Sequence, residues 1–402
     1  MSETRGPLTG MKVIELAHVM AGPTCGRMLA DMGADVIKVE RVPDGDDTRR
    51  FLPPDIGGES AAFMMMNRNK RGVAIDLKNP DGKAVLMKML VDADVLIENY
   101  RADTMSKLGL GYDDLKDHNP GLIYCAISGF GRTGPYSSRG GYDLIAQGMS
   151  GLMSITGEAP GREPVKVGAP VTDITAGILG ALGVSAAYAH KLQTGEGQMV
   201  DTSLFEAGIT HTYWQSAIAL ATGEAPGPMG SRHPLNAPYQ AFKTADGYIN
   251  IGASNTRLWG RLLELLDLQE LADDPRFNDG AARMAHTDEL VNILNGVFGT
   301  QPQAHWLAEL ENVGIPAGPV YDVNEMHADP HTAARDMVIE VDHATAGPVK
   351  TLGLPIKFSE TPGVIDAGAP VFAQHTREVL AEYGYDDAAI DRLIAEGAVI
   401  AA

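Results

Sequence analysis

Cysteine and positive charge are both scarce in this sequence. Its 402 residues include 2 cysteines, Cys25 and Cys125, which lie in different segments and outside any CxxC pair. Neither a disulfide framework nor a zinc site is therefore indicated, and we expect both thiols to be buried. Lysine and arginine number 32 against 52 aspartates and glutamates, a net charge of −20. This charge repels phosphate backbones and anionic membranes, so we expect neither nucleic acid nor a membrane as a partner.

Long apolar runs and a secretory signal are absent as well. The N-terminal stretch MSETRGPLTGMKVIELAHVM has no basic segment followed by an apolar stretch and a cleavage site, and no uninterrupted apolar run reaches the ~18 residues of a spanning helix. We expect a cytoplasmic protein. The hydrophobic content of 44% in 402 residues is sufficient for a sizeable core and for more than one domain.

The N-terminal half alternates apolar strand patterns with helix patterns. The strand-like segments are VIEL, DVIKVE, GVAIDL, DVLIEN and LIYCAISGF, and helical stretches such as AGPTCGRMLADMG and GKAVLMKMLVDA separate them. This alternation predicts parallel strands joined by helical crossovers, that is, an open α/β sheet. A further helix should run from Asp173 to about His190, where Gly177, Gly180 and Gly183 permit close backbone packing.

A segment rich in Gly and Pro, ALATGEAPGPMGSRHPLNAP, marks a boundary in the second half of the chain. After it, YQAFKTADGYINIGAS predicts a hairpin around Ala245, Asp246 and Gly247, and helices are expected over 256–271 and 287–298. We therefore expect a large domain over 1–205, a linker over 206–224, a small α+β domain over 225–325 and a C-terminal segment, 326–402, with strand and helix patterns.

One acidic residue, Asp173, stands at the front of the small-residue helix in VGAPVTDITAGILGALGVSAA. Thr172 or Asp173 can serve as the N-cap of this helix, because such side chains accept hydrogen bonds from its free backbone N–H groups. The alternative is a carboxylate nucleophile, since Gly168, Ala169 and Ala176 leave room for a bulky acyl group. The local sequence does not separate the two.

The chain as a whole resembles family III of the CoA-transferases, the superfamily of formyl-CoA, carnitine-CoA and bile-acid CoA-transferases that also contains the α-methylacyl-CoA racemases. The matching stretches are HVMAGPTCGRMLADMGADVIKVER, GDDTR, NRNKRGVAIDLK, VLIENYRADTMSKLGLGYDDL, IYCAISGFGRTGPYSSRGGYDLIAQGMSGLMSITG, PVKVGAPVTDITAGILGALGVSAAYAHK, TGEGQMVDTSL, PYQAFKTADGYINI and GIPAGPVYDV. The resemblance implies a Rossmann-like large domain, to which the C-terminal segment returns, and an interlocked homodimer.

The resemblance also implies a reaction. In such enzymes the Asp at the position of Asp173 attacks an acyl-CoA, and CoA passes to a second acid through aspartyl anhydride and aspartyl-CoA thioester intermediates. The CoA thioester is a substrate, and no metal or permanently bound cofactor is implied. Tyr142 is implied to lie beside the nucleophile, with a packed core tyrosine as the alternative.

Further site residues are implied by position. The loop after the first strand, His18, Val19, Met20 and Ala21, is implied to line the thioester region with its backbone N–H groups near the reacting carbonyl, although a plain strand-to-helix turn is the alternative. A cluster of polar and basic residues is implied to meet the CoA phosphates, although each can instead be a solvated surface group. These residues are Arg41, Asn69, Lys70, Arg71, Asn99, Arg101 and Lys107.

The sequence departs from the racemases at two positions. Racemases that resemble this chain have His in place of Tyr142 and Glu near the position of Gln240, and neither Tyr nor Gln is a useful base near neutrality. The transferase is therefore favoured, in the style of members that use succinyl-CoA and a C4 to C6 dicarboxylate. A remote carboxylate would want a cation, for which Arg139, Arg232 and His233 are candidates. A 2-methylacyl-CoA racemase and a non-catalytic acyl-CoA-binding protein remain the alternatives.

Overall fold

The computed structural model describes residues 6–402, which contacts within the chain divide into two compact units. The first unit runs from the start of the described chain to Ser150 and includes residues 167–211 and 330–402. The second comprises residues 151–166 and 212–329. Residues 206–224, where a linker is expected, contain most of α9 (Leu204–Thr210) and all of α10 (Tyr213–Thr222).

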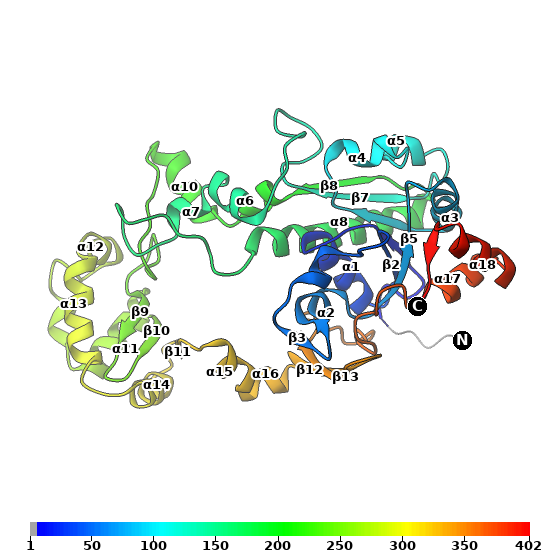
Figure 1. Ribbon diagram of the computed structural model, residues 1–402. Coiled ribbons are helices and arrows are strands. Elements are labelled where there is room, and N and C mark those ends of the chain that lie inside the picture. The colour runs from blue at the N-terminus through cyan, green and yellow to red at the C-terminus, as the bar shows by residue number, and fades with distance from the viewer. Residues whose placement is uncertain (1–5) are drawn as a thin grey trace. The chain divides into compact units, whose positions relative to one another are not determined.

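A seven-stranded sheet in the order β14-β5-β2-β1-β6-β7-β8 forms the centre of the first unit (Figure 1). All neighbouring strands are parallel except β14 and β5. Without β14 the order is that of a Rossmann-like sheet, in which the winding reverses between β1 and β6, so the predicted α/β fold is confirmed. The strands are β1 (Lys12–Glu15), β2 (Asp35–Glu40), β5 (Lys70–Ile75), β6 (Val95–Glu98), β7 (Ile123–Ser128), β8 (Met199–Ser203) and β14 (Val399–Ile400).

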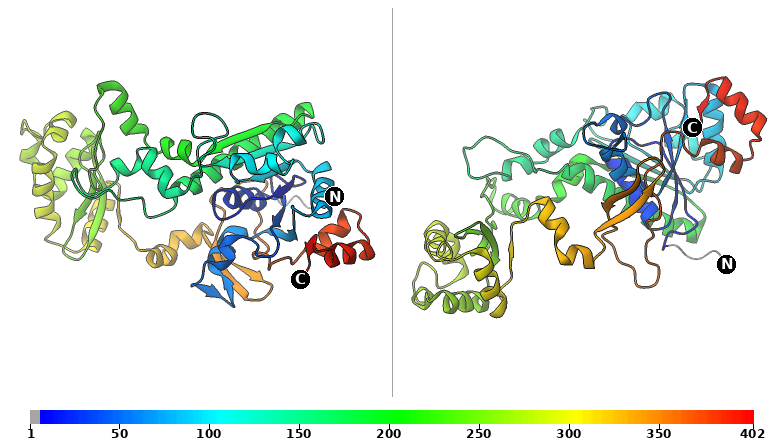
Figure 2. Two further views of the ribbon diagram at one scale, coloured as in Figure 1. Left: turned by 45° about the horizontal axis from the view of Figure 1, so that its top comes forward. Right: turned by 60° about the horizontal axis from the view of Figure 1, so that its bottom comes forward.

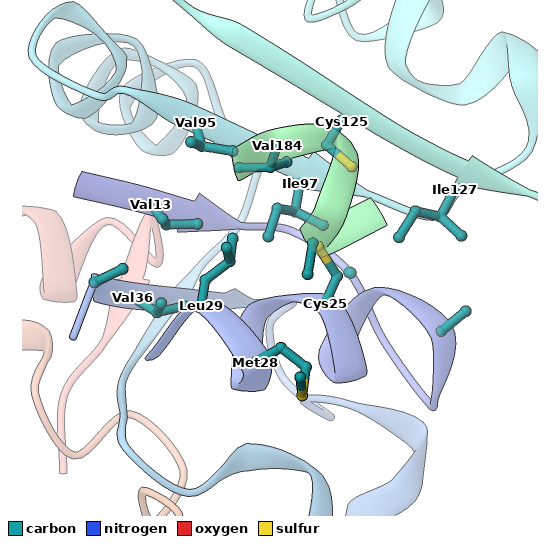
Figure 3. Close-up of a cluster of buried hydrophobic side chains, with 14 of the residues drawn as sticks. Val13, Cys25, Met28, Leu29, Val36, Val95, Ile97, Cys125, Ile127 and Val184 are labelled. Carbon is teal, nitrogen blue, oxygen red and sulfur yellow. The ribbon is translucent and has the colours of Figure 1, made fainter. Parts of the chain in front are cut away.

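Helices bury both faces of this sheet. On one face, α1 (Ala21–Asp31) and α8 (Val171–Thr194) enclose a core that includes Val13, Cys25, Ile97, Cys125 and Val184 (Figure 3), and both thiols are buried as expected. On the other face, α3 (Pro80–Val91), α17 (Thr376–Glu382) and α18 (Asp387–Ala395) pack on alternate strand residues. Because both faces are covered, the strands read as continuous apolar runs rather than as alternating ones.

Helix α8 packs tightly because of its glycines. A Cβ atom at Gly177 would lie 2.5 Å from the Ala21 carbonyl oxygen, and one at Gly180 would lie 2.8 Å from the Ile127 side chain. Among residues 6–402, α8 is the single helix long and apolar enough by composition to cross a membrane. Its glycine face lies on α1 and the sheet.

The C-terminal segment completes the first unit. Strand β14 pairs with β5 at the edge of the sheet, and helices α17 and α18, drawn in orange to red, lie near it (Figure 1). The same red C-terminal helices are visible in both views of Figure 2. The remaining elements of this unit are η1 (Asp47–Arg50), β3 (Asp55–Ile56), β4 (Glu59–Ser60), α2 (Ala61–Asn67), α4 (Ala102–Lys107), α5 (Tyr112–Leu115), α6 (Asp143–Met149), α16 (Pro330–Ala334), β12 (Val338–His343) and β13 (Gly347–Leu352).

The second unit is a smaller α+β structure with its own core. Its antiparallel sheet has the order β11-β10-β9, and the predicted hairpin pairs Lys243 with Tyr248. The helix expected over 256–271 ends at Leu266, because Asp267 adopts a left-handed conformation with φ 56°. The elements are α7 (Leu152–Ile155), α10, β9 (Tyr239–Lys243), β10 (Tyr248–Gly252), α11 (Thr256–Leu266), η2 (Gln269–Ala272), α12 (Gly280–Ala285), α13 (Thr287–Phe298), α14 (Gln303–Asn312), β11 (Ala317–Pro319) and α15 (Val323–Ala328).

Candidate active site

The carboxyl edge of the large sheet brings together the segments that follow β1 and β6. The Asn99 side-chain oxygen accepts a hydrogen bond from the His18 N–H at 2.9 Å, and its amide donates to the His18 carbonyl oxygen at 2.7 Å. This pair lies where the winding of the sheet reverses, and the crevice at that point is where open α/β sheets bind their ligands. Two predicted site residues from different strands are thus joined directly.

A cavity of about 260 Å³ opens beside this pair. Its lining includes His18, Asn99 and Arg101 and, from the segment before α6, Arg139 and Tyr142. Burial lowers the pKa of His18, although the nearby carboxylate of Asp46 opposes the shift, so the imidazole is neutral at pH 7. The cavity therefore presents two guanidinium groups and a neutral histidine to a ligand.

A second cavity, of about 530 Å³, lies at the carboxyl ends of β2 and β5. Arg41, Lys78 and Lys107 line it, and Tyr100 and Thr104 line both this cavity and the first. Arg41 pairs with Asp47, and Lys107 pairs with Asp103, through exposed contacts that are worth little in water. An anionic ligand can therefore recruit these cations. Lys78 was missed by the sequence analysis, although it follows the predicted strand GVAIDL directly.

The N-terminus of α8 is capped from another helix, so the N-cap interpretation of Thr172 or Asp173 is wrong. The helix begins at Val171, and its N-cap residue is Pro170. The Asp143 carboxylate on α6 accepts hydrogen bonds from the Thr172 N–H at 3.0 Å and the Thr172 hydroxyl at 2.8 Å. Because Asp143 performs the capping, the carboxylate of Asp173 is free for another role.

Asp173 has a raised pKa and no partner among residues 6–402 to lower it. Burial, reinforced by the negative charge of Asp143, raises the pKa of Asp173 to about 7. Asp173 also stands one turn before Gly177, on the side of α8 that packs against the first turn of α1. A partly buried acid without a counter-charge costs stability, which makes it a candidate for chemistry.

Tyr142 immediately precedes the capping residue Asp143. It is the N-cap residue of α6, and the residue is 78% exposed, so the alternative of a packed core tyrosine is wrong. Because Tyr142 lines the smaller cavity, its hydroxyl remains available to a ligand there. The hydrogen bond from the Thr172 N–H to Asp143 holds the start of α6, and with it the backbone of Tyr142, next to the first turn of α8.

Three of the predicted CoA-binding residues do not join this group. Asn69, Lys70 and Arg71 lie where β5 begins, at the amino edge of the sheet, beside Asp35 of β2. Arg71 forms ion pairs with Asp35, Glu378 and Glu382 at 2.7–3.1 Å. The Asn69 and Arg71 side chains bond to the fold at this amino edge, and the Lys70 ammonium is buried against Glu15, so we leave all three residues out of the proposed site.

The side chains of Asn69 and Lys70 are engaged in the same way. The Asn69 amide donates to Asp31 and to the Val364 carbonyl oxygen, at 3.0 and 2.6 Å. The Lys70 ammonium is buried against Glu15 at 2.8 Å and also donates to the Pro23 carbonyl oxygen.

The backbone of the loop after β1 is also partly occupied. The His18 N–H donates to Asn99, and the Val19 N–H donates to the Asp46 carboxylate at 3.2 Å. Within residues 6–402, the N–H groups of Met20 and Ala21, at the start of α1, have no acceptor. Of the loop N–H groups expected to face a ligand, only those of Met20 and Ala21 are therefore available within residues 6–402.

In the second unit, the other residues considered in the sequence analysis have local partners. Arg232 forms an ion pair with Asp288 at 2.6 Å, and the His233 ring packs edge-on to Trp214. Gln240 is buried on β9.

Known proteins match this chain along nearly its whole length. The family model for CoA-transferase family III matches residues 8–376. A succinate–glutarate CoA-transferase of Agrobacterium fabrum is 40% identical, with 95% of this chain and 97% of that protein covered. The human succinyl-CoA:glutarate CoA-transferase is 37% identical, with 98% and 90% covered. The crystal structure of a CAIB/BAIF family protein from Brucella suis is 41% identical and superposes with a TM-score of 0.84 over 94% of this chain and all of that one.

Proposed function

The chain belongs to CoA-transferase family III, and on that premise we propose that Asp173 transfers CoA from succinyl-CoA to a free dicarboxylic acid. One observation carries the role of Asp173. Its carboxylate is partly buried at the first turn of α8 with no counter-charge among residues 6–402, and a second acid, Asp143, already caps the helix. The choice of acids rests on relatives whose names specify succinate and glutarate.

The reaction proceeds by exchange at three carbonyl carbons: the succinyl carbon, Cγ of Asp173 and the acyl carbon of the acceptor. A carboxylate oxygen of Asp173 attacks the thioester carbon, the C–S bond breaks, and CoA leaves as a thiolate with an aspartyl–succinyl anhydride behind it. The thiolate then attacks Cγ of Asp173, which releases succinate and leaves an aspartyl-CoA thioester. The acceptor carboxylate attacks the same Cγ and displaces the thiolate, which finally attacks the acceptor's acyl carbon and frees Asp173. Atoms and charge balance without any oxidant or reductant.

The environment of Asp173 suits an acyl-transfer nucleophile. Burial keeps its carboxylate poorly hydrated and its pKa near 7, so the group is more basic than an ordinary aspartate yet largely ionised above neutrality. The N–H groups of Met20 and Ala21 supply donors for the oxyanion that forms at each step. Exclusion of water protects the anhydride and thioester intermediates, because each would otherwise hydrolyse.

The two cavities bind different parts of the acyl-CoA substrate. Arg41, Lys78 and Lys107 bind the CoA phosphates in the larger cavity, where compact cations offset the acidity of the whole protein. The acyl portion lies toward the smaller cavity, where Arg101 and Arg139 offer guanidinium groups to the remote carboxylate of a dicarboxylic acid.

The proposal includes a cytoplasmic homodimer. Helix α10 supports the dimer, because none of its residues is buried although Tyr213, Trp214 and Leu220 are 72%, 57% and 89% exposed. A second copy of the chain would cover this apolar surface. Two free buried thiols fit a reducing compartment.

A transfer assay read by mass spectrometry tests the proposal. Purified protein is incubated with succinyl-CoA and an equimolar pool of C4 to C6 dicarboxylic acids and matched monocarboxylic acids, beside Asp173→Ala. Wild type should form dicarboxylyl-CoA products, and Asp173→Ala should lose at least about 10⁴-fold in rate, as removal of a nucleophile does. Asp81→Ala, in the first turn of α3 on the other face of the sheet, is the matched control and should retain activity.

A second readout identifies the nucleophile itself. Wild type incubated with succinyl-CoA alone should carry CoA on the peptide that contains Asp173, and hydroxylamine should remove it. An adduct on a different peptide, or an active Asp173→Ala enzyme, would refute the role of Asp173. Products formed from monocarboxylic acids alone would refute the choice of acceptor.

A further inference from the structure

Val19 adopts a backbone conformation that valine rarely tolerates. Its φ is 66°, in the left-handed region, where a β-branched side chain clashes with its own backbone. Such a residue persists only where its surroundings impose the conformation. Val19 lies in the loop between β1 and α1, directly before the N–H groups of Met20 and Ala21.

Asp46 is the group that holds this conformation. Both of its carboxylate oxygens accept the Val19 N–H at 3.2 Å. One of them also accepts the N–H and hydroxyl of Thr48, at 2.9 and 2.8 Å, and the other contacts the Lys38 ammonium at 2.9 Å. Every contact that these oxygens make is with a donor, so an amide NH₂ in either place would face another donor.

A buried charge network fixes Asp46 in turn. The Lys38 ammonium contacts Glu15 at 3.1 Å and donates to the Ala17 carbonyl oxygen at 2.8 Å, and Lys70 contacts the other Glu15 oxygen at 2.8 Å. The side chains of Glu15, Lys38, Asp46 and Lys70 are at most 1% exposed. With two positive and two negative groups the network is neutral, which is the condition for burying it.

From the other side, Asn99 clamps the N–H and carbonyl of His18. The peptide groups of Ala17, His18 and Val19 are therefore held by β2 and its following loop on one side and by the residue after β6 on the other. A loop with this many directed bonds has one conformation rather than several.

We propose that Asp46 is a positioning residue for the transfer reaction: its carboxylate holds Val19 in the left-handed conformation and thereby places the Met20 and Ala21 N–H groups and the His18 side chain against the acyl group. The inference rests on the proposed function, because it assigns those groups to the site of Asp173. Asp46 touches neither substrate nor Asp173 and acts through the loop backbone.

The test compares Asp46→Asn with Asp31→Asn. Asp31 is an equally buried acid at the other end of α1, paired with Arg68 at 2.6 Å, so the control makes the same chemical change away from the loop. We expect kcat to fall about 10²-fold in Asp46→Asn with KM for succinyl-CoA changed less than about twofold, because the lost placement affects the transition state. Asp31→Asn should keep kcat within about twofold.

Hydrogen exchange gives a readout that does not depend on activity. Backbone amides between β1 and α1 should exchange faster in Asp46→Asn and at the wild-type rate in Asp31→Asn. Unchanged exchange in folded Asp46→Asn would overturn the inference even if wild type proved inactive. An active wild type with an unimpaired Asp46→Asn enzyme would overturn this inference and leave the proposed function intact.

A double variant tests whether Asp46 acts through Val19. Glycine adopts positive φ without strain, so Val19→Gly removes the need for restraint. The effect of Asp46→Asn on kcat should shrink from about 10²-fold to below about 10-fold in the Val19→Gly background. Equal effects in both backgrounds would contradict the proposed route. If Asp46→Asn fails to fold, Thr48→Ala, which removes a hydroxyl that orients Asp46, should lower kcat without changing KM, and an unchanged kcat would refute the inference.

Discussion

Two acids of the first unit, the buried Asp46 and the partly buried Asp173, have opposite electrostatic environments. Burial alone would raise the pKa of Asp46, but Lys38 and the donors of Thr48 more than offset it and hold that pKa well below its usual range. Burial also raises the pKa of Asp173, and its charged neighbour is another acid, so the pKa reaches about 7. The ion pair with Lys38 keeps Asp46 ionised, so its carboxylate always accepts the hydrogen bond that holds the backbone of Val19. Among residues 6–402, Asp173 has no such ion pair, and its carboxylate therefore stays basic and reactive.

The contrast extends to what each residue does for stability. Asp46 and its partners lie behind the loop, where the carboxylate, Lys38 and Glu15 compensate one another. Within the described part of the chain, no cation compensates Asp173. A protein tolerates such a cost to stability at a functional site. Substitutions in the two places should therefore change stability in opposite directions.

The largest expected effect on stability is that of breaking the network at its centre. Lys38→Met leaves Asp46 buried without its ion-pair partner and Glu15 paired with Lys70 alone, so the free energy of unfolding should fall by about 3–5 kcal/mol. Urea unfolding of both proteins at pH 7.5 measures the difference. Lys116→Met, which breaks an exposed pair with Asp113, is the control and should change stability by less than about 1 kcal/mol. Equal effects of the two substitutions would remove the basis of the comparison.

Substitution of Asp173 should change the stability of the protein in the opposite direction, that is, increase it. Its pKa rises from 3.8 to about 7 on folding, so between these values the folded state binds more protons than the unfolded state. Stability therefore falls as pH rises through this range, and the full penalty is present above pH 7. Asp173→Asn removes the penalty, so its thermal midpoint should exceed that of wild type at pH 8, by a margin that shrinks as the pH approaches 4. A margin that is absent, or that is independent of pH, would show that Asp173 is not strained in the folded protein.

Much of the fold can be predicted from the sequence, because strands that are buried on both faces consist mainly of apolar residues. The segment DVIKVE coincides with β2, and the small-residue pattern after Asp173 marks α8. Strand β14 is different, because two residues, Val399 and Ile400, carry no pattern until they pair with β5. A strand this short depends on its partner, which is distant in sequence.

A site residue can be predicted from the sequence only where its position relative to the end of a strand determines whether it lies at the site. Arg41 and Lys107 lie near the carboxyl ends of strands, and both line one cavity. Arg71 reads as the same kind of residue, yet the acids that neutralise it include Glu378 and Glu382, some 300 residues away. The capping role of Asp143 depends equally on a contact between helices. The sequence gives the sign of each charged side chain, but only the folded structure shows which groups it pairs with.

The smallest expected effect concerns the neighbour of the nucleophile. Only the carboxylate form of Asp173 attacks, so kcat/KM of wild type should fall about tenfold per pH unit below about pH 7. Asp143 is the second cause of the raised pKa, after burial, and Asp143→Asn removes its charge while the Asn oxygen can still accept the Thr172 N–H. The acidic limb of the pH profile should therefore move to lower pH by a fraction of a pH unit.

Initial rates with succinyl-CoA across pH 5–9 measure this shift, and Asp113→Asn on the exposed surface of α5 should leave the limb in place. An unmoved limb in Asp143→Asn would mean that burial alone sets the basicity of Asp173, so that Asp143 serves only as the cap of α8. A limb that moves to lower pH would show that the fold uses one acid twice, to hold a helix and to keep the neighbouring carboxylate basic enough to attack.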